Sequence, residues 1–238
     1  MIDAGLEVRA FFTTREGGIS AGPYGSLNVA DHVGDQPRDV ATNRRIVAEL
    51  AGAPVTFLRA EHGIRVARVH TPGESPPMAD ALVTDVPGIA IAAIAADCVP
   101  VLLHDAASGA VAAIHAGREG LFAGVIDAAI AELLDVRAGW PGHGPISASI
   151  GPAICGRCYE VPEDLRARVG ARHPAALATT AAGTPGLDLP RAVEVRLGEL
   201  GIERIVRNPA CTAESAHLFS HRRDGVTGRF AGVVVCGG

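Results

Sequence analysis

The 238-residue sequence is poor in aromatic residues, in runs of basic residues and in long apolar stretches. Aromatic residues make up only 4% of the chain, so any ring-lined pocket must rest on very few side chains. The formal net charge is −5 and no basic run appears, which argues against nucleic acids and anionic membrane surfaces as partners. The longest apolar stretch, residues 88–96, is far too short to span a bilayer.

The cysteine count and the first residues favour a reducing compartment. Five cysteines are an odd number, and in a chain of this length they argue against a disulfide framework. Residues 1–9 contain Asp3 and Glu7 and lack the apolar segment of a secretory leader. We therefore expect a cytoplasmic protein.

The sequence does contain ample material for a core and clear helix signals. Hydrophobic residues make up 48% and charged residues 20% of the chain, which suits a sizeable core. A capping Asp35 before Pro37 and a stop at Gly52 predict one helix. An apolar four-residue rhythm predicts a second helix over residues 119–136. Two shorter helices are expected, from Pro162 onward and over residues 190–200.

Short apolar runs rich in Val, Ile and Ala predict strands at residues 88–96, 99–104, 110–115, 146–150, 205–207 and 230–236. Their apolarity is continuous, which is typical of strands covered on both faces. Helices and strands intermix without a regular βαβ order, so we expect an α+β fold of stacked sheets flanked by helices. No stretch resembles a linker and no repeat is present, so residues 1–238 are expected to form one domain.

Three potential metal ligands occupy comparable positions beside predicted strands. His62 follows the segment 55–61, Cys98 lies between two apolar strands, and His115 ends a strand. Residues at strand ends can converge on one rim of a sheet, and two imidazoles with one thiolate suit Zn²⁺ and can also hold copper. Three protein ligands leave a fourth position open, as catalytic sites do. Spacing alone is equally compatible with a core cysteine and two surface or capping histidines.

Ordered motifs over nearly the whole chain resemble those of one known family. They are residues 12–18 (FTTREGG), 26–29 (SLNV), 32–35 (HVGD), 43–45 (NRR), 79–84 (ADALVT), 96–100 (ADCVP), 115–117 (HAG), 150–154 (IGPAI), 158–161 (CYEV), 220–225 (SHRRDG) and 227–229 (TGR). Together they resemble the YfiH-type proteins, which are also called laccase-domain multicopper polyphenol oxidases or purine nucleoside phosphorylases.

The resemblance implies a fold, a cofactor and an activity. The implied fold is a mixed β-sheet sandwich flanked by helices, in α/β/β/α layers. The family's two His and one Cys, which hold a catalytic zinc, match His62, Cys98 and His115. The implied activity is phosphorolysis of adenosine, inosine and methylthioadenosine, accompanied by adenosine deaminase activity. A purine nucleoside and phosphate are then the expected partners of a monomer or small homo-oligomer.

The sequence departs from the family pattern directly after the third ligand. Members usually carry Trp followed by Arg or Lys, whereas this chain has Arg118 and Glu119. If the family's cation helps to bind phosphate, an acid at position 119 should repel it. This departure bears on the specific activity more than on the metal site.

The predicted catalytic residues are His62, Cys98 and His115 with Asp97 as a proton carrier, and Glu119 is a second candidate for that role. Both carboxylates are also typical of solvent-facing or capping groups. Phosphate binding calls for guanidinium groups, which hold oxyanions through paired hydrogen bonds. The candidate arginines are Arg15, Arg44, Arg222 and Arg223, with Arg15 and Arg222 preferred. Asn28 and Asn43 are expected to hydrogen-bond a ribose or base, unless they are turn or helix-face amides.

Other functions stay open at this point. One is a copper-dependent (Cu²⁺) polyphenol oxidase, although a multicopper enzyme needs more histidines than nine scattered ones readily provide. Another is a metal-free cysteine hydrolase with Cys98 as nucleophile and His115 as base. A third is a peptidoglycan-editing or binding factor without turnover. The CxxC at residues 155–158 is typical of a redox pair or of half a zinc site, and the sequence has no second CxxC.

Overall fold

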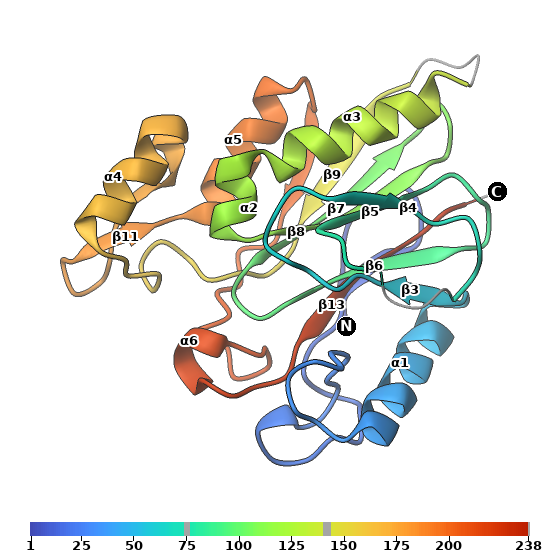
Figure 1. The fold of residues 1–238 in the computed structure, drawn as a ribbon, viewed down its shortest axis with the longest axis horizontal. Coiled ribbons are helices and arrows are strands. Elements are labelled where there is room, and N and C mark those ends of the chain that lie inside the picture. Colours follow the sequence, from blue (N-terminus) through green and yellow to red (C-terminus); the bar gives the residue numbers. More distant parts are fainter. Residues whose placement is uncertain (74–76, 140–143, 238) are drawn as a thin grey trace.

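Two stacked β-sheets form the body of the computed structural model, which describes residues 1–73, 77–139 and 144–237 (Figure 1). The five-stranded sheet has the order β1 (Ile2–Asp3), β2 (Ala10–Phe12), β13 (Phe230–Val235), β6 (Ala90–Ala95) and β3 (Val55–Phe57). The six-stranded sheet has the order β12 (Arg204–Arg207), β9 (Ile146–Ile150), β7 (Val99–Asp105), β8 (Val111–Ala116), β5 (Ala81–Thr84) and β4 (Val66–Arg68). Both sheets mix parallel and antiparallel neighbours. A separate antiparallel pair is formed by β10 (Leu177–Thr179) and β11 (Pro185–Leu187).

Helices cover the outer face of each large sheet. On the five-stranded sheet lies α1 (Pro37–Ala51), and on the six-stranded sheet lie α3 (Val125–Arg137) and α5 (Leu189–Glu199) (Figure 1). The shorter helical elements are α2 (Arg118–Ala123), α4 (Glu163–Arg172), α6 (His221–Asp224), η1 (Gly22–Tyr24) and η2 (Pro174–Ala176). This layering confirms the predicted α+β fold of stacked sheets flanked by helices.

The six-stranded sheet is buried on both faces because its central strands are apolar at successive positions. In β7, Val101 belongs to the core under the helices, whereas Leu102 belongs to the core between the sheets. In β8, Ile114 packs under the helices. Side chains alternate along a strand, so His115 faces the space between the two sheets.

The predicted helix over residues 119–136 is in fact two helices, because Gly124 interrupts it. Gly124 has a left-handed φ of 105°, and its N–H donates to the carbonyls of Gly120 and Leu121 at the end of α2. The apolar rhythm continues across this break, which is why periodicity alone predicts one helix.

The predicted helix that ends at Gly52 is present, but Asp35 does not cap it. The residue at the cap is Gln36, and no side chain caps the first turn. The Asp35 carboxylate instead accepts hydrogen bonds from Ser20 and Asn28 in the preceding loop. A longer-range contact therefore replaces the predicted local one.

The predicted strands correspond to β6, β7, β8, β9, β12 and β13. The remaining strands were not predicted, because each has only two to four residues and is too short for a periodic signal. That residues 1–238 form a single domain stays a prediction.

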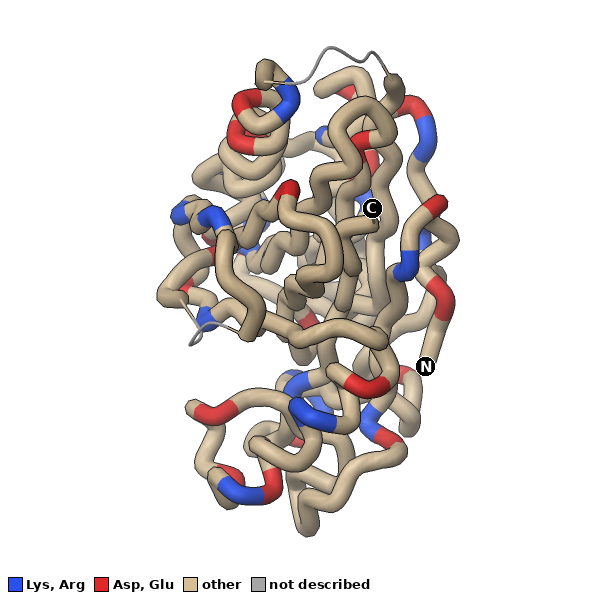
Figure 2. Tube along the Cα trace, turned by 90° about the vertical axis from the view of Figure 1, so that its right-hand side faces the viewer, with Lys and Arg blue, Asp and Glu red and all other residues tan. Residues whose placement is uncertain are grey.

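Acidic and basic residues are interspersed along the chain (Figure 2). Within the part of the chain that the structure describes, no helix combines the length and the apolarity that a membrane crossing requires.

We predict that Gly124→Ala destabilises the protein by about 1–2 kcal/mol, because an L-residue pays about that much in the left-handed region. Gly198→Ala is the matched control, since Gly198 lies inside α5 with open space around its Cα. That change should be neutral or stabilising by up to ~1 kcal/mol. Urea unfolding midpoints measure both effects, and equal stabilities for the two variants would contradict the interpretation of Gly124 as a required break.

Candidate metal centre

The structure brings His62, Cys98 and His115 together. Their candidate ligand atoms all lie within 4.8 Å of one another, and the two imidazole rings meet edge to face with centroids 4.9 Å apart. His115 lies in β8, Cys98 directly precedes β7, and His62 is in the loop between β3 and β4. Because β7 and β8 are antiparallel, with Val99 opposite Ala116, the start of one strand and the end of the other place Cys98 beside His115.

The imidazole of His115 presents Nε2 as a metal ligand. Its Nδ1 lies 2.8 Å from the carbonyl oxygen of Ile94. A carbonyl can only accept, so Nδ1 carries the proton and Nε2 carries a lone pair. The residue is 6% exposed, and burial lowers the pKa of His115, which keeps the ring neutral. Nε2 is buried without a hydrogen-bond partner among the described residues, so a cation there would satisfy it.

Gly117 keeps the space between the three donors free. A Cβ at this position would lie 3.0 Å from His62 Cδ2, 3.2 Å from Cys98 Sγ and 3.4 Å from His115 Nε2. A side chain would therefore crowd the three candidate ligands. This gap, the unpartnered Nε2 and the donor set of two imidazoles and one thiolate fit a borderline-soft cation such as Zn²⁺ or copper.

Asp80 positions two of the three candidate ligands. Its buried carboxylate accepts the backbone N–H groups of Glu61 at 2.9 Å and Arg65 at 3.2 Å, on either side of His62. Its carbonyl oxygen accepts the N–H of His115 at 2.8 Å. His62 has a left-handed φ of 62°, which costs free energy in a non-glycine residue and needs such support.

Asp97 lies where the chain crosses from β6 in one sheet to β7 in the other. Its φ is 93°. Its Oδ1 accepts from the hydroxyls of Thr212 at 2.6 Å and Ser220 at 2.7 Å, and its Oδ2 accepts the N–H of Arg222 at 2.6 Å. These bonds tie the C-terminal segments to the residue before Cys98. A proton-carrier role for Asp97 stays a prediction.

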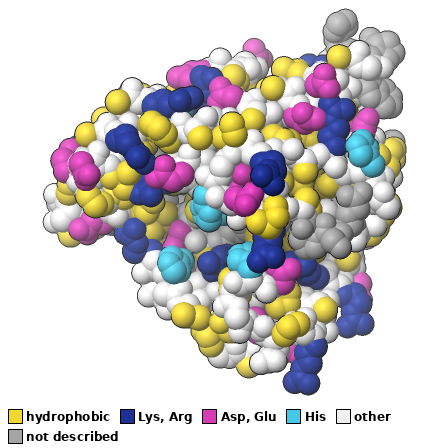
Figure 3. Space-filling model, viewed as in Figure 1, with side chains coloured by type: hydrophobic (Ala, Val, Ile, Leu, Met, Phe, Trp, Pro, Cys, Tyr) yellow, Lys and Arg dark blue, Asp and Glu magenta, His cyan; other side chains and the backbone are white. Residues whose placement is uncertain are grey.

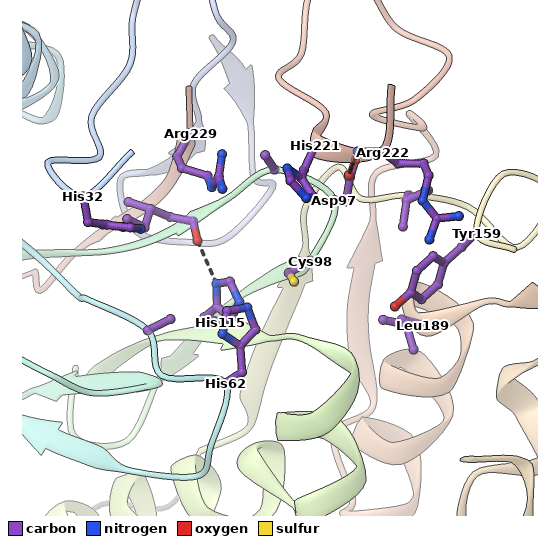
Figure 4. A pocket seen from close by; sticks show the side chains of 14 residues that line it. His32, His62, Asp97, Cys98, His115, Tyr159, Leu189, His221, Arg222 and Arg229 are labelled. Atoms are coloured by element: carbon purple, nitrogen blue, oxygen red, sulfur yellow. Dashed lines mark hydrogen bonds between the residues drawn. The ribbon is translucent and has the colours of Figure 1, made fainter. Parts of the chain in front are cut away.

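A cavity of 370 Å³ opens beside the three ligands (Figure 4). Its volume is in the range of small-molecule sites. In addition to His62, Cys98 and His115, its polar lining includes His32, Asp97, His221, Arg222 and Arg229. Its apolar lining includes Ile154, Tyr159 and Leu189. In the space-filling view, histidine and basic side chains gather around a hollow on this face of the molecule (Figure 3).

Two arginines from the C-terminal segment line this cavity. Arg222, a predicted substrate-binding residue, donates to the carbonyl of Glu160 at 3.0 Å and lies over the Tyr159 ring, 5.0 Å from its centroid. Arg229 donates to the carbonyls of the two residues before it, and its guanidinium points into the cavity (Figure 4). Burial lowers the pKa of Arg229, yet its ordinary value is so high that the charge persists.

The other predicted substrate-binding residues do not line this cavity. Asn28 and Asn43 are fully buried, and Asn43 donates to the carbonyl of Asn28 at 2.9 Å. Arg15 donates to the carbonyl of Gly25 at 2.8 Å and lies over the Phe219 ring. These contacts order the loop after β2, and a substrate role for these three residues stays a prediction.

Glu119 and Arg118 begin α2, outside the residues that line the cavity. The Glu119 carboxylate accepts two hydrogen bonds from Arg168, at 2.8 and 2.9 Å, and forms an ion pair with Arg118 at 2.9 Å. Its charge is thus paired with two guanidinium groups, which weakens the repulsion of phosphate that the sequence predicts.

Reasoning from residue types assigned no role to Asp80, Tyr159 or Arg229. Each lies inside one of the family motifs, at residues 79–84, 158–161 and 227–229, and only this membership could have indicated them. Their positions depend on contacts between segments far apart in the chain, which no local pattern reveals.

The sequence matches the family described as multi-copper polyphenol oxidoreductase laccase over residues 9–237. The chain belongs to this family. Purine nucleoside phosphorylase SCO2081 of Streptomyces coelicolor is 50% identical over 228 residues, covering 94% of this chain and 93% of the relative. Purine nucleoside phosphorylase Rv2149c of Mycobacterium tuberculosis is 45% identical over 233 residues, covering 96% and 92%. These matches confirm the predicted family.

Solved structures confirm the family fold. The Neisseria meningitidis protein NMB0706 superposes with a TM-score of 0.86 at 36% identity, covering 99% of this chain and 96% of that one. YlmD from Geobacillus stearothermophilus gives 0.85 at 33% identity, covering 96% and 92%. The likeness extends over the whole sandwich and thus over every element that carries a candidate ligand.

We predict that Asp80→Asn lowers the affinity for Zn²⁺ by about 10–100-fold, the usual cost of losing a group that orients metal ligands. An amide nitrogen cannot accept the N–H of Glu61 or Arg65, so the His62 turn loses one of its two anchors. Asp85→Asn is the control, since Asp85 does not line the cavity. Competition with a chromophoric chelator measures the affinity, and an unchanged value in Asp80→Asn would refute this role.

Proposed function

We propose that the protein is a zinc-dependent purine nucleoside phosphorylase that acts on adenosine, inosine and methylthioadenosine and also deaminates adenosine. The observation that carries the proposal is the meeting of His62, Cys98 and His115 with two arginines at a single cavity. The Streptomyces and Mycobacterium relatives named purine nucleoside phosphorylase support it over nearly the whole chain.

The two arginines are suited to hold the phosphate. In phosphorolysis a phosphate oxygen bonds to C1′ of the ribose while the bond from C1′ to the purine nitrogen breaks, and that nitrogen takes up a proton. The attacking phosphate is an anion, and guanidinium groups bind its oxygens through charge-assisted hydrogen bonds. Arg222 and Arg229 line the same cavity, so we assign phosphate binding to both.

The apolar lining is suited to hold the purine. Tyr159, Ile154 and Leu189 offer one aromatic face and two aliphatic side chains, and a purine ring stacks favourably on such groups. Burial raises the pKa of Tyr159, which keeps its hydroxyl protonated and able to donate. His221 donates from Nδ1 to the carbonyl of Gly225, which leaves a lone pair on Nε2 that can accept an N–H of the purine.

His62, Cys98 and His115 would hold the zinc, with Nε2 of His115 as one donor. Bound zinc supplies Lewis-acid chemistry, which polarises an oxygen of the reactants. Copper suits the same donors, and the family description supports a copper-dependent polyphenol oxidase as a second candidate. Among the described residues only this one candidate metal group contains histidine, which favours a single metal ion at the cavity.

The free state of all the cysteines in the structure supports the proposed cytoplasmic location. The assembly as a monomer or small homo-oligomer also stays a proposal.

The reaction itself provides the first test. Zinc-loaded protein given adenosine and phosphate should release adenine and ribose 1-phosphate in equal amounts, and adenine release should stop without phosphate. Inosine should form whether or not phosphate is present. Polyphenol oxidation only with added copper would favour the second candidate instead. If a hydrolytic activity persists in the His62→Ala variant, the protein would instead be a cysteine hydrolase with Cys98 as its nucleophile. If no activity of any kind is found, the protein would be a binding or editing factor.

We further predict that Arg229→Met raises KM for phosphate by about 10–100-fold, because a hydrogen bond to a charged group contributes about 1.5–3 kcal/mol. Arg204→Met is the control, since Arg204 pairs with Glu7 and lies outside the cavity lining. Initial rates at varied phosphate and saturating adenosine give the KM for phosphate of each variant. A KM for phosphate that is the same in both variants would exclude Arg229 from phosphate binding.

A further inference from the structure

A second group of metal-ligand residues lies outside the cavity lining. It consists of Cys155, Cys158, Cys211 and Glu214, and its three sulfur atoms and one carboxylate oxygen all lie within 4.8 Å of one another. The first two cysteines are in the loop between β9 and α4, and the other two residues are in the loop between β12 and α6. Residues more than fifty positions apart in the chain thus meet at a single point.

Each loop presents its two donors from the same kind of turn. The carbonyl of Cys155 accepts the N–H groups of Cys158 and Tyr159, both at 3.0 Å. The carbonyl of Cys211 accepts the N–H groups of Glu214 and Ser215 at 3.2 and 3.0 Å. The sequence therefore contains two equivalent halves, CGRC at residues 155–158 and CTAE at residues 211–214. A search for a second CxxC overlooks the other half because its last donor is a carboxylate.

Backbone contacts hold the two turns side by side. Ala153 and Cys211 form a parallel bridge, and the N–H of Thr212 donates to the carbonyl of Ala153 at 3.1 Å. The N–H of Cys155 points at Cys211 Sγ, 3.4 Å away. Gly156 permits the close approach of the first turn to its surroundings, since a Cβ there would lie 2.8 Å from Ala178 Cβ. The backbone thus sets the donor positions.

We propose that these four residues form a second, structural zinc site with three thiolates and one carboxylate. Thiolates select Zn²⁺ among the common divalent cations, and a structural zinc is held by four protein ligands in a tetrahedron. With Zn–S bonds of about 2.3 Å, such ligands lie about 3.7 Å apart, which is compatible with the spacing observed here. A simple redox pair would use two of the cysteines and leave Cys211 and Glu214 without a role.

The position of this site gives it a structural task. Thr212, which follows Cys211, bonds to the Asp97 carboxylate, and the N–H of Ile154, which precedes Cys155, bonds to the Asp97 carbonyl at 3.0 Å. A zinc at this point would lock together two loops that both contact the residue before Cys98.

Metal counting tests the proposal on the full chain. Protein purified without chelator should contain two zinc ions per chain, His62→Ala and Cys158→Ser one each, and the double variant none. Cys158→His keeps a zinc ligand and should retain both ions. Cys236→Ser is the matched control, because Cys236 is a buried cysteine outside both groups. If the cavity site holds no zinc, the wild type should contain one ion that only Cys158→Ser loses, so failure of the proposed function is distinguishable.

Thiol labelling of the wild type gives a test that does not depend on a variant folding. N-ethylmaleimide followed by mass spectrometry should leave Cys155 and Cys158 unmodified until a chelator removes the zinc. Equal labelling with and without chelator would overturn the proposal. So would labelling that appears only after a reductant, which would indicate a disulfide, or a zinc content that Cys158→Ser leaves unchanged.

Discussion

One buried nitrogen, Nε2 of His115, is the atom on which the cavity site depends. A buried polar atom without a partner costs about 1–3 kcal/mol, and the other ring nitrogen is already committed to the Ile94 carbonyl. The ring therefore cannot turn to satisfy Nε2 without losing that bond. A cation shared with Cys98 and His62 would remove this cost, because the candidate ligand atoms of the three residues lie within 4.8 Å of one another. The lone pair that has no partner in the protein is thus the one that the proposed metal would use.

Two aspartates, Asp80 and Asp97, fix the backbone around the candidate ligands. The Asp80 carboxylate accepts a backbone N–H beside His62, and its backbone carbonyl accepts the N–H of His115. The Asp97 carboxylate accepts hydrogen bonds from Thr212, Ser220 and Arg222 where the chain crosses between the sheets. Neither carboxylate is free in the structure, since both are engaged by N–H or O–H donors. Hydrogen bonds from backbone N–H groups and hydroxyls thus hold both carboxylates in place, and the side chains of Arg222 and Arg229 supply the positive charge of the cavity lining.

The sequence was sufficient where the chemistry is local. Continuous apolar runs predict the central strands. The family resemblance singles out His62, Cys98 and His115, and the fold brings their candidate ligand atoms within 4.8 Å of one another. The sequence was insufficient where the position of a residue depends on contacts with distant segments of the chain. Gly124 splits a helix that periodicity predicts as one, Asp35 bonds to a loop instead of capping, and Arg229 reaches the cavity from the other end of the chain. A family resemblance names motifs, but only the contacts distinguish the residues that face the cavity from those that hold the loops.

The strain in the backbone indicates how the two proposed metal sites are connected. Among the described residues, the non-glycine residues with positive φ are His62, a proposed ligand, and Asp97, the neighbour of the proposed ligand Cys98. Such conformations persist only where the surroundings over-determine them. Three of the bonds that hold Asp97 come from the side chain of Thr212, the side chain of Ser220 and the backbone of Ile154. Thr212 and Ile154 are each next to a cysteine of the second group, so one residue and one hydrogen bond separate Cys211 from Asp97, and Asp97 adjoins Cys98. The proposed four-ligand zinc site would thus hold Asp97 in its strained conformation beside the open three-ligand site at the cavity. A rigid four-ligand site would then fix the positions of the donor atoms at the cavity.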